Sequence, residues 1–234
     1  MSEKGILYGI GVGPGDPELL TLKAVRALGE VDVIFAAAST KNDYSTALSI
    51  AQPHLRADVR IEQLGFPMTK DKDALEEAWR ENARIVHEVL DQGLNGAFIT
   101  LGDPLTYSTY GYLQRTLLEM DHNVRLQAIP GITSFHAAAA RIGLVLAESS
   151  ESLLITSGVA DPEVLERQLD VADNAVILKA YKNFEEIRAT LKRLRLGDKT
   201  VLVSRLGMEG ESILMDINDA PSRPHYFSLA LVKK

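Results

Sequence analysis

The sequence predicts an α/β protein built from two domains. Through the first 143 residues, short apolar runs alternate with longer amphipathic stretches, and this strand–helix alternation repeats five times. Such a rhythm indicates a mostly parallel sheet with right-handed crossover connections. After Gly207 two apolar runs follow with no helical stretch between them, which predicts an antiparallel element and a mixed sheet. We place the domains at residues 1–143 and 151–234, with residues 144–150 as the linker.

The first domain is predicted to open with a buried strand and a well-marked helix. The apolar residues 6–12 form the strand and end in a glycine-rich turn. Asp16 then offers an N-cap and Pro17 occupies the first helical position, a combination typical of a helix start. Leu22 and Leu28 are expected on the apolar stripe of this helix.

The remaining elements follow the same two periods. Residues 73–91 form the clearest predicted helix, because Leu75, Trp79, Val86, Val89 and Leu90 recur at three- and four-residue spacing. Further strands are predicted at residues 31–38, 60–66, 96–101, 124–129, 152–156, 175–181, 200–205, 213–217 and 226–232, and further helices at residues 46–55, 109–119, 133–142, 162–171 and 184–194.

The composition restricts the chemistry. The 234 residues include 25 Lys and Arg against 32 Asp and Glu, which gives a net charge of −7, and no cysteine. The missing cysteines exclude disulfides, thiolate catalysis and Cys-ligated metal sites, and the acidic balance argues against nucleic acid as a partner. No signal-peptide pattern opens the chain, and no apolar stretch approaches the roughly 18 residues that span a bilayer. We therefore expect a cytoplasmic protein with no membrane partner.

The first glycine cluster runs from Gly9 to Asp16 at a predicted strand end. Glycines there would let a ligand approach the backbone, and the next helix offers free N–H groups. The dinucleotide fingerprint GxGxxG does not fit, because Pro14 and Asp16 stand where its third glycine is required. A tight structural turn is the alternative interpretation.

Two more clusters also follow predicted strands. Asp103, in Gly102-Asp103-Pro104, can accept hydrogen bonds from ligand hydroxyls or an ammonium, or it can cap the next helix. Thr133 and Ser134 place two hydroxyls at a helix start, which capping alone would also explain. Ligands bind outside the carboxyl ends of strands in open α/β sheets. Uncharged or acidic loops at that edge suit a cationic, hydroxyl-bearing ligand better than a polyphosphate.

Other common reactive sites are missing from the sequence. The five histidines show no HExxH pairing, no serine lies in GxSxG, and there is no GxxxxGK[ST] loop. We therefore expect no protein-bound metal, no hydrolase nucleophile and no nucleoside triphosphate loop.

In this order the three clusters resemble the motifs of the tetrapyrrole methylase family. Members of that family are S-adenosylmethionine-dependent C-methyltransferases of corrinoid and sirohaem synthesis. Residues 8–22 resemble the first motif of the family, and residues 130–134 its Pro-Gly-Ile-Thr/Ser segment. Residues 101–104 resemble its Gly-Gly-Asp-Pro motif, with Leu101 in place of the first glycine. The resemblance spans essentially the whole chain. It implies a homodimer with an active site in the cleft between two α/β domains.

Finer motifs are similar to those of precorrin-2 or cobalt-factor II C(20)-methyltransferases, namely residues 66–69, 103–110 and 178–183. The resemblance thus implies methyl transfer from S-adenosylmethionine to the C(20) meso carbon of precorrin-2 or cobalt-factor II in cobalamin biosynthesis. Carried over residue by residue, it implies S-adenosylmethionine binding by Pro14, Leu101, Gly102, Asp103, Thr106, Thr133, Ser134, Lys179 and Leu206.

The implied reaction also needs a proton acceptor and a site for an anionic tetrapyrrole. Asp103 and Tyr107 are candidate catalytic acceptors because they lie beside the donor motif. A polycarboxylate substrate on a protein of net charge −7 predicts a local basic lining, for which we name Lys41, Arg115 and Lys182. Two alternatives stay open, another ring-methylating enzyme such as uroporphyrinogen-III C-methyltransferase and a non-catalytic nucleoside-binding regulatory module.

Overall fold

The computed structural model describes residues 3–39, 45–67, 69, 71–159 and 161–234. The chain divides into two compact units, Met1–Thr133 and Ser134–Lys234, which we call the first and second unit. The division comes before helix α5 (Ser134–Ile142), whereas the sequence rhythm placed it at residues 144–150. The difference has a packing cause, because the buried Phe135 and Ala138 of α5 join a hydrophobic core of the second unit.

The first unit is built on a five-stranded parallel sheet in the order β3-β2-β4-β1-β5. Every neighbouring pair in this sheet is parallel, which confirms the predicted fold class for this part of the chain. The strands are β1 (Ile6–Gly11), β2 (Val33–Ser39), β3 (Arg60–Phe66), β4 (Gly96–Thr100) and β5 (Arg125–Ile129).

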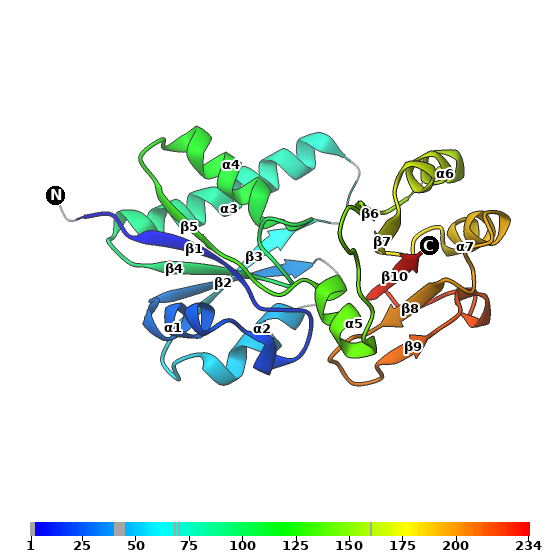
Figure 1. The fold of residues 1–234 in the computed structure, drawn as a ribbon. Coiled ribbons are helices and arrows are strands. Elements are labelled where there is room, and N and C mark those ends of the chain that lie inside the picture. Colours follow the sequence, from blue (N-terminus) through cyan, green and yellow to red (C-terminus); the bar gives the residue numbers. More distant parts are fainter. Residues whose placement is uncertain (1–2, 40–44, 68, 70, 160) are drawn as a thin grey trace. The chain divides into compact units, whose positions relative to one another are not determined.

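Helices cover both faces of this sheet (Figure 1). Helices α1 (Leu22–Glu30) and α2 (Thr46–Ala51) share a core with Ala97 and Ile99 of β4, while α3 (Lys72–Asp91) and α4 (Tyr110–Met120) share the opposite core with Phe98. Because both faces are buried, β4 is apolar at successive positions rather than alternating with polar residues. A 3₁₀ turn η2 (Gln52–His54) extends α2.

The predicted helix start at Asp16 is only partly right. Asp16 caps a separate 3₁₀ turn, η1 (Pro17–Leu19), by accepting a hydrogen bond of 2.9 Å from the Glu18 N–H. Helix α1 begins later, where the Thr21 hydroxyl caps it. Leu22 therefore stands in the first turn with 86% of its surface exposed, and its predicted place on the apolar stripe is wrong.

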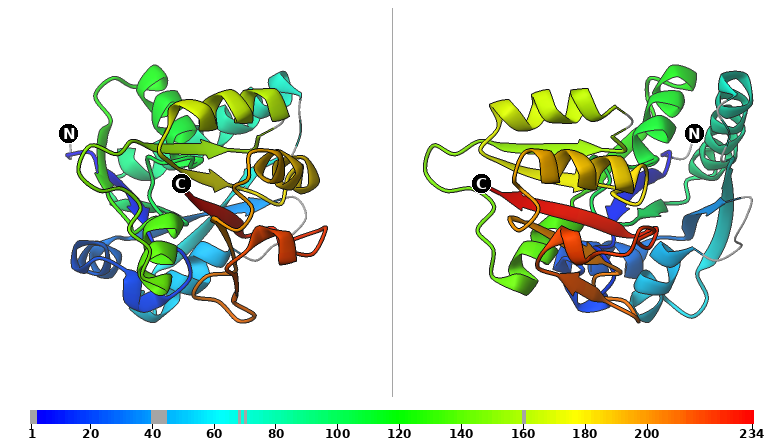
Figure 2. Two further views of the ribbon diagram at one scale, coloured as in Figure 1. Left: turned by 45° about the vertical axis from the view of Figure 1, so that its right-hand side comes forward. Right: turned by 90° about the vertical axis from the view of Figure 1, so that its right-hand side faces the viewer.

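The second unit contains a mixed five-stranded sheet in the order β6-β7-β10-β8-β9. Strand β6 is parallel to β7, whereas β10 is antiparallel to both of its neighbours, which confirms the predicted mixed sheet. Helices α6 and α7 lie side by side on one face (Figure 2), and α5 packs on the other. The elements are β6 (Leu153–Ser157), α6 (Pro162–Val171), β7 (Asn174–Leu178), α7 (Phe184–Arg193), β8 (Thr200–Ser204), β9 (Ser212–Leu214), η3 (Ile217–Asp219) and β10 (Ser228–Lys233). Among the helices described, none combines the length and apolarity needed to cross a bilayer.

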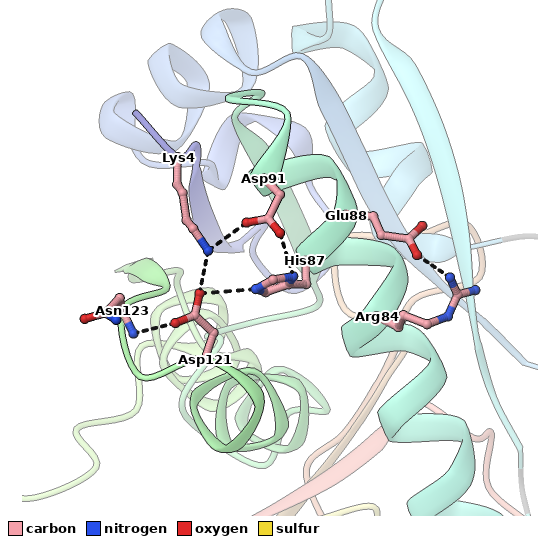
Figure 3. A network of polar contacts seen from close by, with 7 residues as sticks. All are labelled: Lys4, Arg84, His87, Glu88, Asp91, Asp121 and Asn123. Carbon is pink, nitrogen blue, oxygen red and sulfur yellow. Dashed lines mark hydrogen bonds and ion pairs between the residues drawn. The ribbon is translucent and has the colours of Figure 1, made fainter. Parts of the chain in front are cut away.

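A polar network ties the amino edge of the first sheet together (Figure 3). The Lys4 ammonium, just before β1, lies 2.7 Å from Asp91 at the end of α3 and 2.8 Å from Asp121 after α4. His87 contacts both carboxylates at 3.2 Å. The hydrogen bond from Lys4, followed by those from the Asn123 backbone and His87, holds the pKa of Asp121 well below its usual range. The network therefore joins three segments at the edge opposite the loops described next.

Candidate functional site

The order of the strands places a topological switch point between β1 and β4. These strands are neighbours, yet α1, which follows β1, packs on one face and α4, which follows β4, packs on the other. In open α/β sheets, ligands bind outside the carboxyl ends of the strands at such a point. The loops that leave it, residues 12–16 and 101–109, and the loop after β5, residues 130–133, are called here the switch-point loops.

Glycines allow the switch-point loops to pack backbone against backbone. Gly13 and Gly102 exchange N–H···O bonds of 3.3 and 2.8 Å. A Cβ on Gly131 would stand 2.1 Å from the Gly102 carbonyl oxygen, and one on Gly11 would stand 2.3 Å from it. Gly13 also has a φ of +80°, which side chains disfavour. Ligand approach and a tight structural turn were the two interpretations of the first glycine cluster. At Gly11 the group nearest to an added Cβ is the Gly102 carbonyl of a neighbouring loop, so a structural contact alone requires glycine there.

Asp103 joins two of the switch-point loops. Its Oδ1 accepts hydrogen bonds from the Leu105 N–H at 2.9 Å and the Thr106 hydroxyl at 3.3 Å. Its Oδ2 accepts one from the Gly131 N–H at 3.2 Å. The carboxylate therefore orders its own loop and fastens it to the loop after β5. Helix α4 begins beyond its reach, where the Ser108 hydroxyl accepts from the Tyr110 N–H at 3.1 Å.

Two tyrosines follow Asp103 with opposite environments. Tyr107 is 54% exposed and adopts a φ of +52°. Tyr110 is fully buried, and its ring lies against Gly9, where a Cβ would meet the ring at 2.3 Å. Burial raises the pKa of Tyr110 to about 12, and its hydroxyl has no hydrogen-bond partner within the described residues. Tyr107 is thus the tyrosine accessible to a ligand, and Tyr110 is part of the core.

The structure brings most of the predicted donor-binding residues of the first unit to this edge. Pro14 is buried in the loop after β1, Leu101 packs partly against the core under α1 and α2, and Thr106 bonds Asp103. A Cβ on Gly102 would lie 3.8 Å from the Thr133 Cα, so the loops after β4 and β5 also meet there.

The other three predicted donor-binding residues belong to the second unit. Ser134 is the first residue of α5, and Leu206, only 8% exposed, shares a hydrophobic core with its neighbour Phe135. Lys179 follows β7 with a φ of +53°. Desolvation and the charge of Lys182 lower the pKa of Lys179.

The three basic residues predicted to line the substrate site have different outcomes. Lys41 lies outside the described residues. Arg115 lies on α4, with its guanidinium 5.0 Å from the centre of the Tyr112 ring, and lines a surface pocket with Glu76 and Glu119 rather than the switch-point loops. Lys182 is exposed and lies near Lys179. It is therefore the one of the three that the structure places beside a predicted donor-binding residue.

The chemistry of the switch-point loops fits a sulfonium nucleoside. They carry the carboxylate of Asp103 and the hydroxyls of Thr106 and Thr133, and their sequences contain no Lys or Arg. Loops with this charge attract a cation and offer hydrogen bonds to ribose hydroxyls, whereas a polyphosphate would be repelled by the carboxylates and find no side-chain cation in these loops.

Comparison with known proteins decides the family. The model for tetrapyrrole (corrin/porphyrin) methylases matches residues 6–220. The chain belongs to the tetrapyrrole methylase family. One relative is a cobalt-precorrin-2 C(20)-methyltransferase of Salmonella typhimurium, 35% identical over 98% of this chain and 97% of the relative. Another is a precorrin-2 C(20)-methyltransferase of a Sinorhizobium species, 32% identical over 97% of this chain and 95% of the relative.

Solved structures of tetrapyrrole methylases share the fold. Uroporphyrin-III C-methyltransferase from Thermus thermophilus, complexed with S-adenosylhomocysteine, superposes with a TM-score of 0.70 at 23% identity, over 98% of this chain and 92% of that one. The parallel sheet of the first unit and the mixed sheet of the second, each with its helices, therefore represent the fold of this family.

Sequence reasoning missed two features that the structure brings out. The Thr100 and Ser108 hydroxyls lie 3.0 Å apart and link β4 to the turn before α4. Arg205, directly after β8, occupies the same kind of position as Lys179 after β7. The sequence signal that could have identified Arg205 is a basic residue immediately after a buried apolar strand. This pattern occurs after both β7 and β8.

Proposed function

We propose that this protein transfers the methyl group of S-adenosylmethionine to the C(20) meso carbon of precorrin-2 or its cobalt complex in cobalamin biosynthesis. The observation that carries the proposal is the match to two C(20)-methyltransferases along nearly the whole length of each chain. The switch-point loops support it because their charge and hydroxyls suit a cationic nucleoside. That the protein needs no bound metal of its own stays a prediction.

The proposed role of the protein is mainly to position the reactants. S-adenosylmethionine supplies a methyl group already activated on a sulfonium, and an electron-rich tetrapyrrole supplies the carbon nucleophile. Holding two reactants in line removes much of the entropic cost of their reaction. The hydrogen bonds of Asp103 to Thr106 and Gly131 fix the loops that we propose to bind the donor.

Methyl transfer to a meso carbon leaves a proton to be removed, and we propose Asp103 and Tyr107 as its acceptors. Asp103→Asn separates a proton role from the loop-fastening role seen above. Loss of methylation with unchanged S-adenosylhomocysteine affinity would support proton acceptance by Asp103. Equal loss of both would leave Asp103 as a positioning residue and Tyr107 as the acceptor to test, by Tyr107→Phe. Asp161→Asn is the matched control, because Asp161 lies outside the switch-point loops and caps α6 by accepting a hydrogen bond of 2.9 Å from the Glu163 N–H, and asparagine caps a helix as well as aspartate does.

The decisive experiment uses S-adenosylmethionine labelled with ¹³C in its methyl group. The protein is incubated separately with precorrin-2, with its cobalt complex and with uroporphyrinogen III, and the labelled carbon is located by NMR. We expect label at C(20) with one of the first two substrates, which also tells which of them is used. Label on uroporphyrinogen III would favour the ring-methylating alternative, and nucleoside binding without transfer would favour the regulatory module.

We further propose that the protein acts in the cytoplasm as a homodimer, with neither nucleic acid nor membrane as a partner. The resemblance to the family supports the dimer. Light scattering coupled to size-exclusion chromatography should then give twice the monomer mass of 25.6 kDa. A monomeric mass at micromolar concentration would contradict this.

A further inference from the structure

Two cations occupy equivalent positions at one edge of the second sheet. Strands β7 and β8 run in the same direction on either side of β10, and Lys179 and Arg205 are the residues immediately after them. The Arg205 N–H donates to the Phe227 carbonyl at 2.8 Å, and the Ala180 N–H donates to the Ser228 carbonyl at 3.0 Å. Lys179 and Arg205 therefore flank the beginning of β10 from its two sides.

Both cations adopt a backbone conformation that long side chains rarely take. Lys179 has a φ of +53° and Arg205 a φ of +54°. Non-glycine residues in this region are strained, and such residues concentrate at binding and catalytic sites. Lys179 and Arg205 thus share a backbone conformation as well as equivalent strand ends.

In the part of the chain that the structure describes, no acidic side chain pairs with the cations at this edge. Within the described residues, Lys179, Lys182 and Arg205 make no ion pair, and the buried Nε of Arg205 has no hydrogen-bond partner. Desolvation and the charge of Arg205 lower the pKa of His225, as desolvation and Lys182 lower that of Lys179. The lowered pKa keeps His225 uncharged at neutral pH, so Lys179, Lys182 and Arg205 are the charged groups here, and a bound anion could form charge-assisted hydrogen bonds with them.

One acidic side chain in the loop after β8 is already engaged. The Glu211 carboxylate lies 3.0 Å from the Arg141 Nε and accepts a hydrogen bond of 2.8 Å from the Gly207 N–H. The same loop also carries the exposed Glu209, so Lys179, Lys182 and Arg205 outnumber the one acid of that loop that is not engaged.

Aromatic rings connect the two groups of cations. The Tyr181 and Tyr226 rings are 4.8 Å apart, Tyr226 and Phe227 are 5.0 Å apart, and Phe227 and His225 are 5.7 Å apart, centre to centre. Tyr181 lies between Lys179 and Lys182 in the sequence, and Arg205 bonds the backbone of Phe227. The edge therefore offers cations on either side of a row of aromatic rings.

We propose that these residues form a carboxylate-binding subsite in which Lys179 and Arg205 hold carboxylates of the bound reactants. We call them the edge cluster, and it consists of Lys179, Tyr181, Lys182, Arg205, His225, Tyr226 and Phe227. The ligand assignment rests on the proposed function, which supplies two sources of carboxylate, the acidic side chains of the tetrapyrrole and the amino-acid end of the methyl donor. The aromatic row fits the planar, polycarboxylate tetrapyrrole, and the edge cluster supplies the basic lining that a protein of this charge needs.

The test measures binding rather than turnover. Uroporphyrin, a stable polycarboxylate tetrapyrrole, is titrated by fluorescence at several salt concentrations against wild type, Lys179→Asn and Arg205→Asn. Asparagine tolerates a positive φ, so these changes remove charge without adding backbone strain. Arg195→Asn is the matched control, because Arg195 is an exposed arginine with a φ of +58° at the opposite edge, before β8.

We expect the two edge-cluster variants to bind uroporphyrin about tenfold or more weakly and with a smaller salt dependence, as loss of a charge-assisted hydrogen bond requires. Arg195→Asn should bind as wild type does. Coproporphyrin, which has half as many carboxylates, should lose less affinity in the same variants. Circular dichroism melts confirm that the variants are folded.

A second arm distinguishes the two sources of carboxylate. The variants are titrated with S-adenosylhomocysteine and with 5′-methylthioadenosine, which lacks the amino-acid end. Weaker binding of the first ligand alone would assign the edge cluster to the donor carboxylate, whereas unchanged binding of both with weaker uroporphyrin binding assigns it to the tetrapyrrole.

Affinities for all ligands within twofold of the Arg195→Asn control would overturn the subsite. This failure is distinct from that of the proposed function. The labelling experiment can succeed with the wild-type protein while the edge cluster proves inert, and the edge cluster can bind carboxylates even if the labelled methyl appears at another carbon.

Discussion

Substitution of Gly131 by alanine tests whether the three switch-point loops depend on backbone contact. The new Cβ would stand 2.1 Å from the Gly102 carbonyl oxygen and 2.7 Å from the Gly11 Cα, whereas ordinary contacts begin at 3.4 Å. The obstructing atoms are backbone on both sides, so one loop must retreat by more than about 1 Å. Overpacking of this kind costs about 1–3 kcal/mol, which corresponds to a Tm about 2–12 °C lower for a chain of this size.

The retreat should also disturb the Gly131 N–H bond to Asp103, and with it the affinity for S-adenosylhomocysteine. Differential scanning calorimetry gives the Tm, and isothermal titration gives the affinity. Gly29→Ala is the control, because nothing lies within 4 Å of a Cβ there and Gly29 is inside α1, where alanine is favoured by up to about 1 kcal/mol. If Gly131→Ala melted and bound as the wild type does, the loops could not be held together as described.

Three further substitutions test other parts of the structure. Tyr110→Phe removes a buried hydroxyl that has no partner within the described residues and should raise the unfolding free energy in urea by about 1 kcal/mol; a loss would show that the hydroxyl is satisfied. Leu22→Glu places an acid in the exposed first turn of α1 and should be neutral or stabilising by up to about 0.5 kcal/mol, whereas a clear loss would restore Leu22 to the core. The low pKa of Asp121 implies stability that is present above about pH 4 and lost as the pH falls. Asp121→Asn should therefore melt below wild type at pH 7, with the gap closing in acid; a gap of constant size would exclude the ion pairs as its cause.

The periodicity of the sequence was sufficient to predict the fold class. Strands buried on both faces, such as β4, are recognisable as continuous apolar runs. The two late strands without a helix between them predicted an antiparallel element, and the structure forms it through β8, with which both β9 and β10 pair. The start of α1 was not predictable in the same way. Asp16 and Thr21 are both good caps, and only the packing of the loop after β1 decides that one caps a 3₁₀ turn and the other the helix.

The candidate site was predictable in part. Glycines and Asp103 at strand ends predicted that these loops would meet at one edge of the first sheet, and they do, because the carboxyl ends of parallel strands lie at the same edge. What the sequence could not show is that Gly11 and Gly131 face a neighbouring carbonyl, since that contact joins residues far apart in the chain. Arg115 shows the same limit. Its position over the Tyr112 ring follows from the face of α4 on which it lies, and the net charge of the chain does not predict that face.

The strand order of the second sheet has a consequence for how the protein is made. Strand β10 occupies the centre of that sheet, with β6 and β7 on one side and β8 and β9 on the other, yet it is the last of the five to be synthesised. Until β10 emerges from the ribosome, the described strands of the two halves are not joined by ladder hydrogen bonds, and β7 and β8 expose the edges that β10 will cover. The first sheet has no such delay, because its strands are all complete by Ile129. The nascent chain therefore passes through a stage in which one sheet is finished and the other is divided, and this is when the second unit is most exposed to aggregation.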